Sequence, residues 1–305
     1  MDSRPFVQTS PDFPSALFPF TSRYLDLDGI RMHYVDEGRP DAPPVLLLHG
    51  NPTWSFFYRD IIRDLRATHR VIAPDHVGCG LSDKPRRYPY RLATHVDNVE
   101  KLIDALRLVG ITLGVHDWGG AIGFGLACRR PQRFRRFIVF NAAAFFGPAP
   151  WRIRVCRWPL VGALIVRGFN GFARPAATMA VRRRLPPDVR AGFLAPYRCW
   201  GDRVAIWSFV KDIPTRPSHP SWAVIESIDG SLPQFRDRPT LICWGMRDFC
   251  FDADFLEGWR ARFPEAEVHR FEDAGHYLLE DAGDRIVPLV RAFVSEAASE
   301  HEPPR

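Results

Sequence analysis

Short apolar runs bounded by turn residues alternate with segments of helical period, and this alternation restricts the possible folds of the chain. The runs are VLLLHG (45–50), RVIAPD (70–75), ITLGVH (111–116), FIVFNA (137–142), TLICWG (240–245) and EVHRFED (267–273). Before them, Asp28-Gly29 separates two further strand-like runs and favours a tight hairpin turn. The sequence therefore predicts an α/β fold, with an eight-stranded, mostly parallel sheet flanked by helices.

The rhythm of strands is interrupted after the run that ends at residue 142. Strand-like runs stop, and five of the nine tryptophans lie between residues 145 and 230. The rhythm resumes with the run at 240–245. We expect a core built from residues 1–144 and 233–305, with residues 145–232 inserted as a helical lid.

The predicted lid is basic, while the rest of the chain is about neutral. The whole chain has a net charge of +6, and residues 145–230 contain twelve Arg and one Lys against five acidic residues. Arginines alternate with Trp and Leu and no nucleic-acid motif accompanies them, so we expect no nucleic-acid partner. A basic, tryptophan-rich lid is compatible with self-association into a homo-oligomer or with docking onto partner enzymes.

Targeting signals and membrane spans are not expected. The N-terminal stretch MDSRPFVQTSPDFPSALFPF lacks the apolar core of a secretory signal. The longest uncharged apolar stretch, at 118–128, has eleven residues, whereas a transmembrane helix needs about twenty. We therefore expect a cytoplasmic enzyme without a transmembrane segment.

The motif VHDWGG (115–120) follows a buried strand and opens a helix. In α/β-hydrolase-fold enzymes this strand–turn–helix context holds the nucleophile, here Asp117. Gly119 and Gly120 supply the small neighbours that the sharp turn needs. The helix N-terminus is expected to stabilise the Asp117 anion and keep it ionised. An Asp before a helix is also a common N-cap, so the motif alone leaves both interpretations open.

Two further residues follow the chain order of nucleophile, acid and histidine that this fold requires. Asp248 comes after the strand TLICWG, and His276 comes after the last strand. The other place for the acid, after FIVFNA, is excluded because residues 118–187 contain no Asp or Glu. Their joint placement favours a catalytic triad of Asp117, His276 and Asp248.

A carboxylate nucleophile favours displacement at a saturated carbon over attack on a carbonyl group. The expected intermediate is an alkyl ester of Asp117, which water activated by His276 hydrolyses while Asp248 orients the imidazole. The leaving anion needs donors, and the Asn51 amide and the Trp118 indole N–H are the candidates. Asn51 could instead be a turn residue and Trp118 a packed aromatic.

At these residues the chain resembles the haloalkane dehalogenases over essentially its whole length. The matching blocks are HGNPTWSFFYRD, PDHVGCGLSDKP, VHDWGGAIGF, WGMRD and DAGHYLLED. The donor pair Asn51 and Trp118, with an Asp acid, is similar to the third subfamily. This resemblance implies a hydrolase that cleaves carbon–halogen bonds of small apolar haloalkanes and binds the released halide ion.

Other blocks resemble the related β-lactone decarboxylases of bacterial long-chain olefin biosynthesis. These blocks are FNAAAF, LAPYRCWGDRVAIWSFVKDIP and GMRDFCFD. The resemblance implies the same five residues, with the donor pair holding the carboxylate that develops from a cis-3-alkyl-4-alkyloxetan-2-one, which then loses CO₂ to give an alkene. The lid run WPLVGALIVRGF could line a long-chain pocket or form an ordinary amphipathic helix.

Rival interpretations fit the sequence less well. Epoxide hydrolases usually place two tyrosines in the lid, and this lid has only Tyr197. Fluoroacetate dehalogenases have an Asp-Arg elbow, a serine esterase would need a serine at 117, and an inactive scaffold normally loses part of the triad. No metal or organic cofactor is implied, because neither a ligand cluster nor a glycine-rich phosphate loop occurs.

Overall fold

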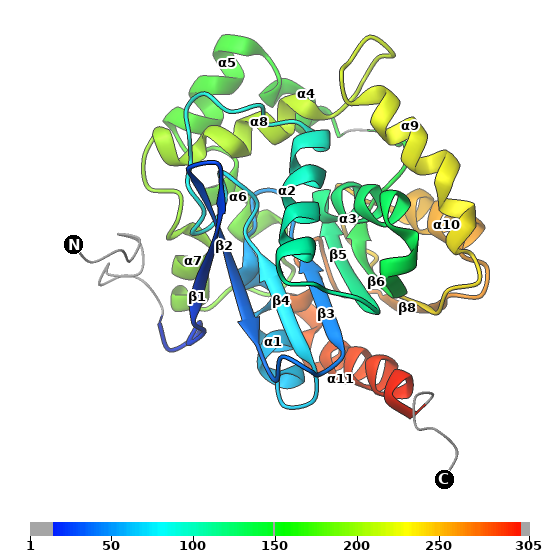
Figure 1. Ribbon diagram of the computed structural model, residues 1–305. Coiled ribbons are helices and arrows are strands. Elements are labelled where there is room, and N and C mark those ends of the chain that lie inside the picture. Colours follow the sequence, from blue (N-terminus) through cyan, green and yellow to red (C-terminus); the bar gives the residue numbers. More distant parts are fainter. Residues whose placement is uncertain (1–14, 149, 300–305) are drawn as a thin grey trace.

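The computed structural model describes residues 15–148 and 150–299, which form a sheet of eight strands flanked by helices (Figure 1). The strands are β1 (Ser22–Leu27), β2 (Ile30–Glu37), β3 (Pro44–Leu48), β4 (Arg70–Pro74), β5 (Ile111–Asp117), β6 (Phe134–Ala142), β7 (Thr240–Gly245) and β8 (Glu267–Phe271). Their order is β1-β2-β4-β3-β5-β6-β7-β8. Strand β2 is antiparallel to both neighbours, and the other pairs are parallel. The predicted fold class is confirmed.

The hairpin turn between β1 and β2 has the expected chemistry. Leu27 pairs with Ile30, which leaves Asp28 and Gly29 as a two-residue loop. Both have positive φ, 55° and 88°, as the tight turns that match the twist of a hairpin require. Asp and Gly tolerate this conformation better than most residues, so the local sequence determines the turn.

Helices cover both faces of the sheet because successive strand residues point to opposite sides. Val45 and Leu47 of β3 belong to the core under α1 and α11, while Leu46 and Leu48 belong to the core under α2 and α3. The helices around the sheet are η1 (Ser55–Tyr58), α1 (Arg59–Leu65), α2 (Leu92–Ala105), α3 (Trp118–Arg129), η2 (Pro131–Arg133), α10 (Ala253–Arg262) and α11 (Leu278–Ser299).

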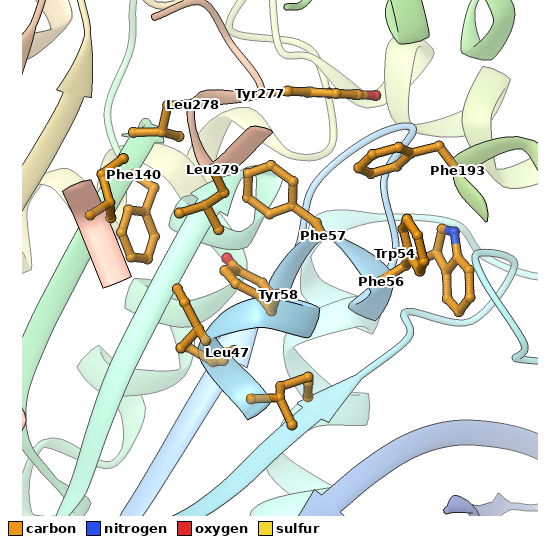
Figure 2. Packing of buried hydrophobic residues seen from close by; sticks show 14 of the residues in the cluster. Leu47, Trp54, Phe56, Phe57, Tyr58, Phe140, Phe193, Tyr277, Leu278 and Leu279 are labelled. Carbon is orange, nitrogen blue, oxygen red and sulfur yellow. The ribbon is translucent and has the colours of Figure 1, made fainter. Parts of the chain in front are cut away.

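The segment between β6 and β7 is helical and lies over one end of the sheet (Figure 1). Its helices are α4 (Trp151–Cys156), α5 (Pro159–Ala163), η3 (Leu164–Gly168, a π-helix), α6 (Ala173–Met179), α7 (Pro187–Leu194), η4 (Gly201–Arg203), α8 (Val204–Asp212), α9 (Trp222–Ser231) and η5 (Leu232–Phe235). Figure 2 shows Phe193 of α7 beside Trp54 and Phe56, so an aromatic cluster joins this segment to the core.

The structure differs from the sequence-based expectation at two helices. The stripe from Trp54 to Leu65 predicts one helix, but the backbone of Trp54 is extended and η1 precedes α1. The Trp54 indole donates to Gly192 O at 3.1 Å, a contact to the lid that no local pattern could reveal. The sequence pattern predicts a closing helix near 283–298, but α11 begins at Leu278 and is kinked at Ala282. None of the helices within the described residues is both long and apolar enough to span a membrane.

Candidate active site

Asp117 sits on the sharp turn between β5 and α3. Its φ of 52° and ψ of −121° are a strained conformation for a residue with a side chain, and such strain is typical of functional sites. A Cβ on Gly119 would lie 2.0 Å from Leu48 O, and one on Gly50 would lie 2.1 Å from Asp117 Oδ1. The turn can form only because both positions are glycine.

The three residues predicted as a triad come together at this turn. His276 Nδ1 lies 2.8 Å from Asp248 Oδ2, and His276 Nε2 lies 3.8 Å from Asp117 Oδ2. All three side chains are largely buried, so solvent screens their charges little. The imidazole therefore lies between two carboxylates, with its Nδ1 bound to one and its Nε2 directed at the other.

Burial raises the pKa of Asp117, and this effect is larger than the opposing effects of its partners. Nearby His276 and the backbone N–H groups of Asn51 and Trp118 lower it, but the net direction is upward. The Asn51 N–H donates to Asp117 Oδ1 at 2.6 Å. The backbone N–H of Trp118, at the N-terminus of α3, therefore favours the Asp117 anion as expected, while desolvation has the larger effect on the pKa.

The pKa of His276 is shifted upward as well. Burial lowers this pKa, but the charge and hydrogen bond of Asp248 and the charge of Asp117 together raise it above its ordinary value. His116 Nε2 lies 2.9 Å from the backbone oxygen of His276 and helps to hold this loop. Burial and the neighbouring His276 lower the pKa of His116 far below its usual range, so His116 is neutral.

Asn141 contacts the Asp248 carboxylate, and the sequence alone did not indicate this contact. Its Nδ2 donates to Asp248 Oδ2 at 3.0 Å and to Gly245 O at 3.1 Å, and its Oδ1 accepts from Gly245 N at 2.7 Å. The other oxygen of Asp248 accepts from Cys250 N at 2.6 Å. The available signal was a polar residue at the end of β6, a position from which the fold can also supply the acid.

The predicted donors, Asn51 and Trp118, line the same cavity as Asp117 and His276. The Asn51 side chain donates from Nδ2 to Ile206 O at 3.1 Å, a bond that fixes the amide against α8. Asn51 Oδ1 is buried without a protein partner among the described residues. Trp118 is half-buried, with its ring centroid 5.3 Å from that of Phe209. Trp118 therefore packs against Phe209 and also lines the cavity.

The cavity above Asp117 has a volume of about 310 Å³ and is mainly apolar. Lid residues such as Ile153, Cys156, Phe172 and Met179 line it. The run WPLVGALIVRGF (158–169) contributes no lining residue, and its Trp158 and Leu160 are exposed. This run therefore does not line the cavity above Asp117, but Trp158 lines a second pocket that shares Phe146 and Pro214 with that cavity.

Comparison with known proteins agrees with this geometry. The model of a protein family described as alpha/beta hydrolase fold matches residues 43–171 and 203–283. These ranges include all five predicted site residues. This chain belongs to the α/β-hydrolase-fold family.

Three individual α/β-hydrolases show how far the similarity extends. A cis-3-alkyl-4-alkyloxetan-2-one decarboxylase of Shewanella oneidensis is 43% identical over 288 residues, which cover 92% of this chain and 90% of that protein. Haloalkane dehalogenase 2 of Mycobacterium tuberculosis is 34% identical over 293 residues, with 93% and 98% covered. The crystal structure of haloalkane dehalogenase DatA from Agrobacterium tumefaciens C58 superposes with a TM-score of 0.83 at 25% identity, with 92% and 99% covered.

A buried carboxylate in this α/β-hydrolase connects the His276 loop to the lid. Asp281 accepts hydrogen bonds from the backbone N–H of Gly275 at 2.8 Å, of Arg182 at 2.8 Å and of Arg183 at 2.8 Å. Tyr277 N also donates to Ala180 O at 2.8 Å. No local pattern indicates this clamp, because Asp281 is an ordinary first-turn acid of α11.

Metal ligation is a separate matter from the triad. Within the described ranges, His, Cys, Asp and Glu side chains form no group of three or more that could hold a metal ion. Asp117, His276, Asn51 and Trp118 line the cavity, while the Asp248 carboxylate is fully buried against His276 Nδ1. The chemistry open to this arrangement is nucleophilic attack by a carboxylate, assisted by N–H donors and an imidazole.

Proposed function

We propose that this enzyme uses Asp117 as a nucleophile on a small apolar substrate, and that its reaction is the decarboxylation of a cis-3-alkyl-4-alkyloxetan-2-one. One observation supports this most strongly: the Asp117 carboxylate faces an apolar cavity that it shares with Asn51 and Trp118. The 43% identity to a decarboxylase of these β-lactones favours this substrate class over haloalkanes.

The steps balance without water or a cofactor. A carboxylate oxygen of Asp117 attacks ring carbon 4, and the bond from that carbon to the ring oxygen breaks. The ring oxygen becomes part of a carboxylate on carbon 3, which Asn51 and Trp118 stabilise by hydrogen bonds. That carboxylate then leaves as CO₂, its bonding electrons form the carbon–carbon double bond, and Asp117 departs from carbon 4 as the free carboxylate.

Hydrolysis of carbon–halogen bonds is the second candidate, because His276 lies where a hydrolytic base belongs. In this reaction Asp117 displaces the halide, which the same two donors stabilise, and an alkyl ester forms. His276 Nε2, 3.8 Å from Asp117 Oδ2, has room to remove a proton from water that attacks the ester carbonyl. Identity of 34% to haloalkane dehalogenase 2 supports this candidate.

Two parallel assays test the proposal. The purified enzyme is given a cis-3-alkyl-4-alkyloxetan-2-one, and alkene is measured by gas chromatography; separately, halide release is measured from a panel of terminal bromoalkanes. We expect alkene formation that the Asp117→Ala protein lacks. Halide release at ordinary enzymatic efficiency, without Asp117-dependent alkene, would replace decarboxylation by dehalogenation. Absence of both products would reject the nucleophilic role of Asp117.

The His276→Ala variant separates the two reactions further. Decarboxylation as written needs no base, so alkene formation should survive in this variant at a measurable rate. Dehalogenation needs the base for the second step, so a bromoalkane should leave the alkyl group on Asp117 as an added mass on the intact protein. A bromoalkane that reacts without leaving this adduct would argue against the covalent route.

A further inference from the structure

The outer side of the lid exposes apolar side chains next to one another. We define the lid patch as Trp158, Leu160, Val161, Leu164, Phe169 and Trp200, all of which are exposed. The exposed fraction reaches 86% for Leu160 and 70% for Phe169. Soluble proteins commonly expose single apolar residues, but a group of large ones marks an interaction surface.

These residues form one surface because a single helical stretch carries most of them. Along α5 and η3, Gly162 and Val166 face inward, while Leu160 and Leu164 lie one turn apart on the outside. A Cβ on Gly168 would lie 3.1 Å from Leu164 Cδ1 and 3.6 Å from Trp200 Cζ3. Trp200 is thereby joined to the helical stretch. Figure 1 shows α5 at the outer end of the lid, away from the sheet.

Arginines flank the lid patch. Arg154 lies on α4 and Arg157 follows at its C-terminal end, and the Arg167 guanidinium carbon lies 4.5 Å from the Trp200 ring centroid. In the described part of the chain, no carboxylate lies within ion-pair distance of these three arginines. Burial lowers the pKa of Arg157, Asp212 raises it, and Arg216 and Arg154 lower it. Arg157 also donates to Ile213 O, while Arg154 is exposed beside the patch.

We propose that the lid patch docks onto an anionic lipid surface, with Leu160, Leu164 and the tryptophans in the interfacial region and the arginines at the lipid phosphates. Exposed Trp, Phe and Leu beside Arg on a short helix are the chemistry of an interfacial helix. Arginine stems lie along apolar surface while their charged ends reach the headgroups. This proposal goes beyond the reaction and does not depend on it.

The charge also decides between occupants of the lid patch. A second copy of this chain would bring one basic surface against another, and the like charges would oppose a symmetric dimer through this face. An acidic protein partner would match the charge, but lipid also matches the protruding apolar side chains, which an acyl boundary can surround. Docking would bring the lid, and the apolar cavity beneath it, to the place where apolar substrates accumulate.

Vesicle flotation tests the proposal with the full-length protein. The vesicles contain phosphatidylcholine alone, or phosphatidylcholine and phosphatidylglycerol in equal parts. We expect binding to the anionic vesicles only, weakened by added salt. Leu160→Ser combined with Leu164→Ser should weaken binding by roughly tenfold or more through lost apolar burial. Arg154→Gln should weaken it by about fivefold, the scale of one cation at an anionic surface.

Matched controls lie on the opposite side of the molecule. Val109→Ser removes an apolar side chain that is 60% exposed in the turn before β5, and Arg39→Gln removes an exposed cation. Neither should change flotation, and circular dichroism should show every variant to be folded. If the leucine variants fail to fold, Arg154→Gln against Arg39→Gln still decides.

Three outcomes would overturn the proposal. The first is a folded wild-type protein that floats with neither kind of vesicle. The second is flotation that the lid-patch variants leave unchanged, which would move binding to another surface. The third is a wild-type dimer in light scattering that Leu160→Ser with Leu164→Ser dissociates, without any vesicle binding. That result would assign the lid patch to a second copy.

Discussion

Charged and apolar side chains are arranged in opposite ways at the catalytic turn and on the outer side of the lid. At the turn, Asp117, Asp248 and His276 are largely buried, and each charged group has a hydrogen-bonding or ionic partner a few ångströms away. On the lid, Leu160 and Phe169 are exposed. Within the described residues, Arg154, Arg157 and Arg167 have no carboxylate at ion-pair distance, whereas Arg198 pairs with Asp202. Buried charged groups have shifted pKa values, which are typical of reactive sites. A large exposed apolar surface is instead typical of a site that binds another molecule or a membrane.

The largest effect should come from the turn. Asp117→Asn keeps the size and the strained backbone but removes the nucleophilic oxygen, so we expect loss of all measurable turnover with either substrate class. The measurement is alkene and halide formation by the same protein preparation. Substantial residual activity in a folded Asp117→Asn protein would contradict the nucleophile assignment and would leave the buried charge at the turn without a function.

The next effect concerns stability and contrasts the inner and outer sides of the lid. Phe193 is buried, with ring centroids 5.1 Å from those of both Phe56 and Tyr277. Phe193→Ala should therefore reduce the free energy of unfolding by about 3–5 kcal/mol, as cavities in aromatic cores do. Urea unfolding followed by circular dichroism measures this change.

Leu164→Ala is the matched control on the outer side. Leu164 is 53% exposed, so its truncation should change the free energy of unfolding by less than about 0.5 kcal/mol. A large loss for Leu164→Ala would mean that the lid patch is part of the stabilising core. The contrast between the two sides of the lid would then fail.

The sequence predicted most of the sheet because its signals are local. Apolar runs of β3 to β8 and the Asp28-Gly29 turn depend on residues that are neighbours in the chain. The order of nucleophile, acid and histidine also predicted that Asp117, Asp248 and His276 would meet, since each follows a strand of one parallel sheet. Whether these residues act as proposed is for the kinetic experiments to decide.

The remaining features depend on contacts between distant parts of the chain. Asn141 meets Asp248 across 107 positions, and Asp281 meets Arg182 across 99. The run at 158–169 is apolar almost all round, so periodicity could not tell which side faces water. Only the packing of Gly162 and Val166 against the rest of the lid turns Leu160 and Leu164 outward.

Trp118 tests whether the donors belong to the reactive turn or to the packing of the lid. Trp118→Phe keeps an aromatic ring near Phe209 but removes the indole N–H together with part of the ring. We expect the displacement step to slow by about a hundredfold, the scale for one oxyanion-type donor, with little change in stability. Single-turnover kinetics measure the step. An unchanged rate accompanied by lower stability would make Trp118 a packing residue only.

The smallest predicted effect is the pH dependence of His276, and it separates stability from hydrolysis. Because Asp248 and Asp117 raise its pKa in the folded protein despite burial, the protonated imidazole stabilises the fold. This stabilisation is complete below the unfolded-state pKa and is lost as pH rises through the folded-state pKa. Hydrolysis of an alkyl ester on Asp117 needs the neutral imidazole, so its rate should rise with pH. Because the ester removes the Asp117 charge, this rise should lie at lower pH than the loss of stability. As pH rises, the rate of ester hydrolysis should increase while the free energy of urea unfolding should decrease. In the Asp248→Asn variant, both changes should occur at lower pH. A hydrolysis limb at higher pH than the loss of stability would contradict the assigned coupling between the two carboxylates and the imidazole.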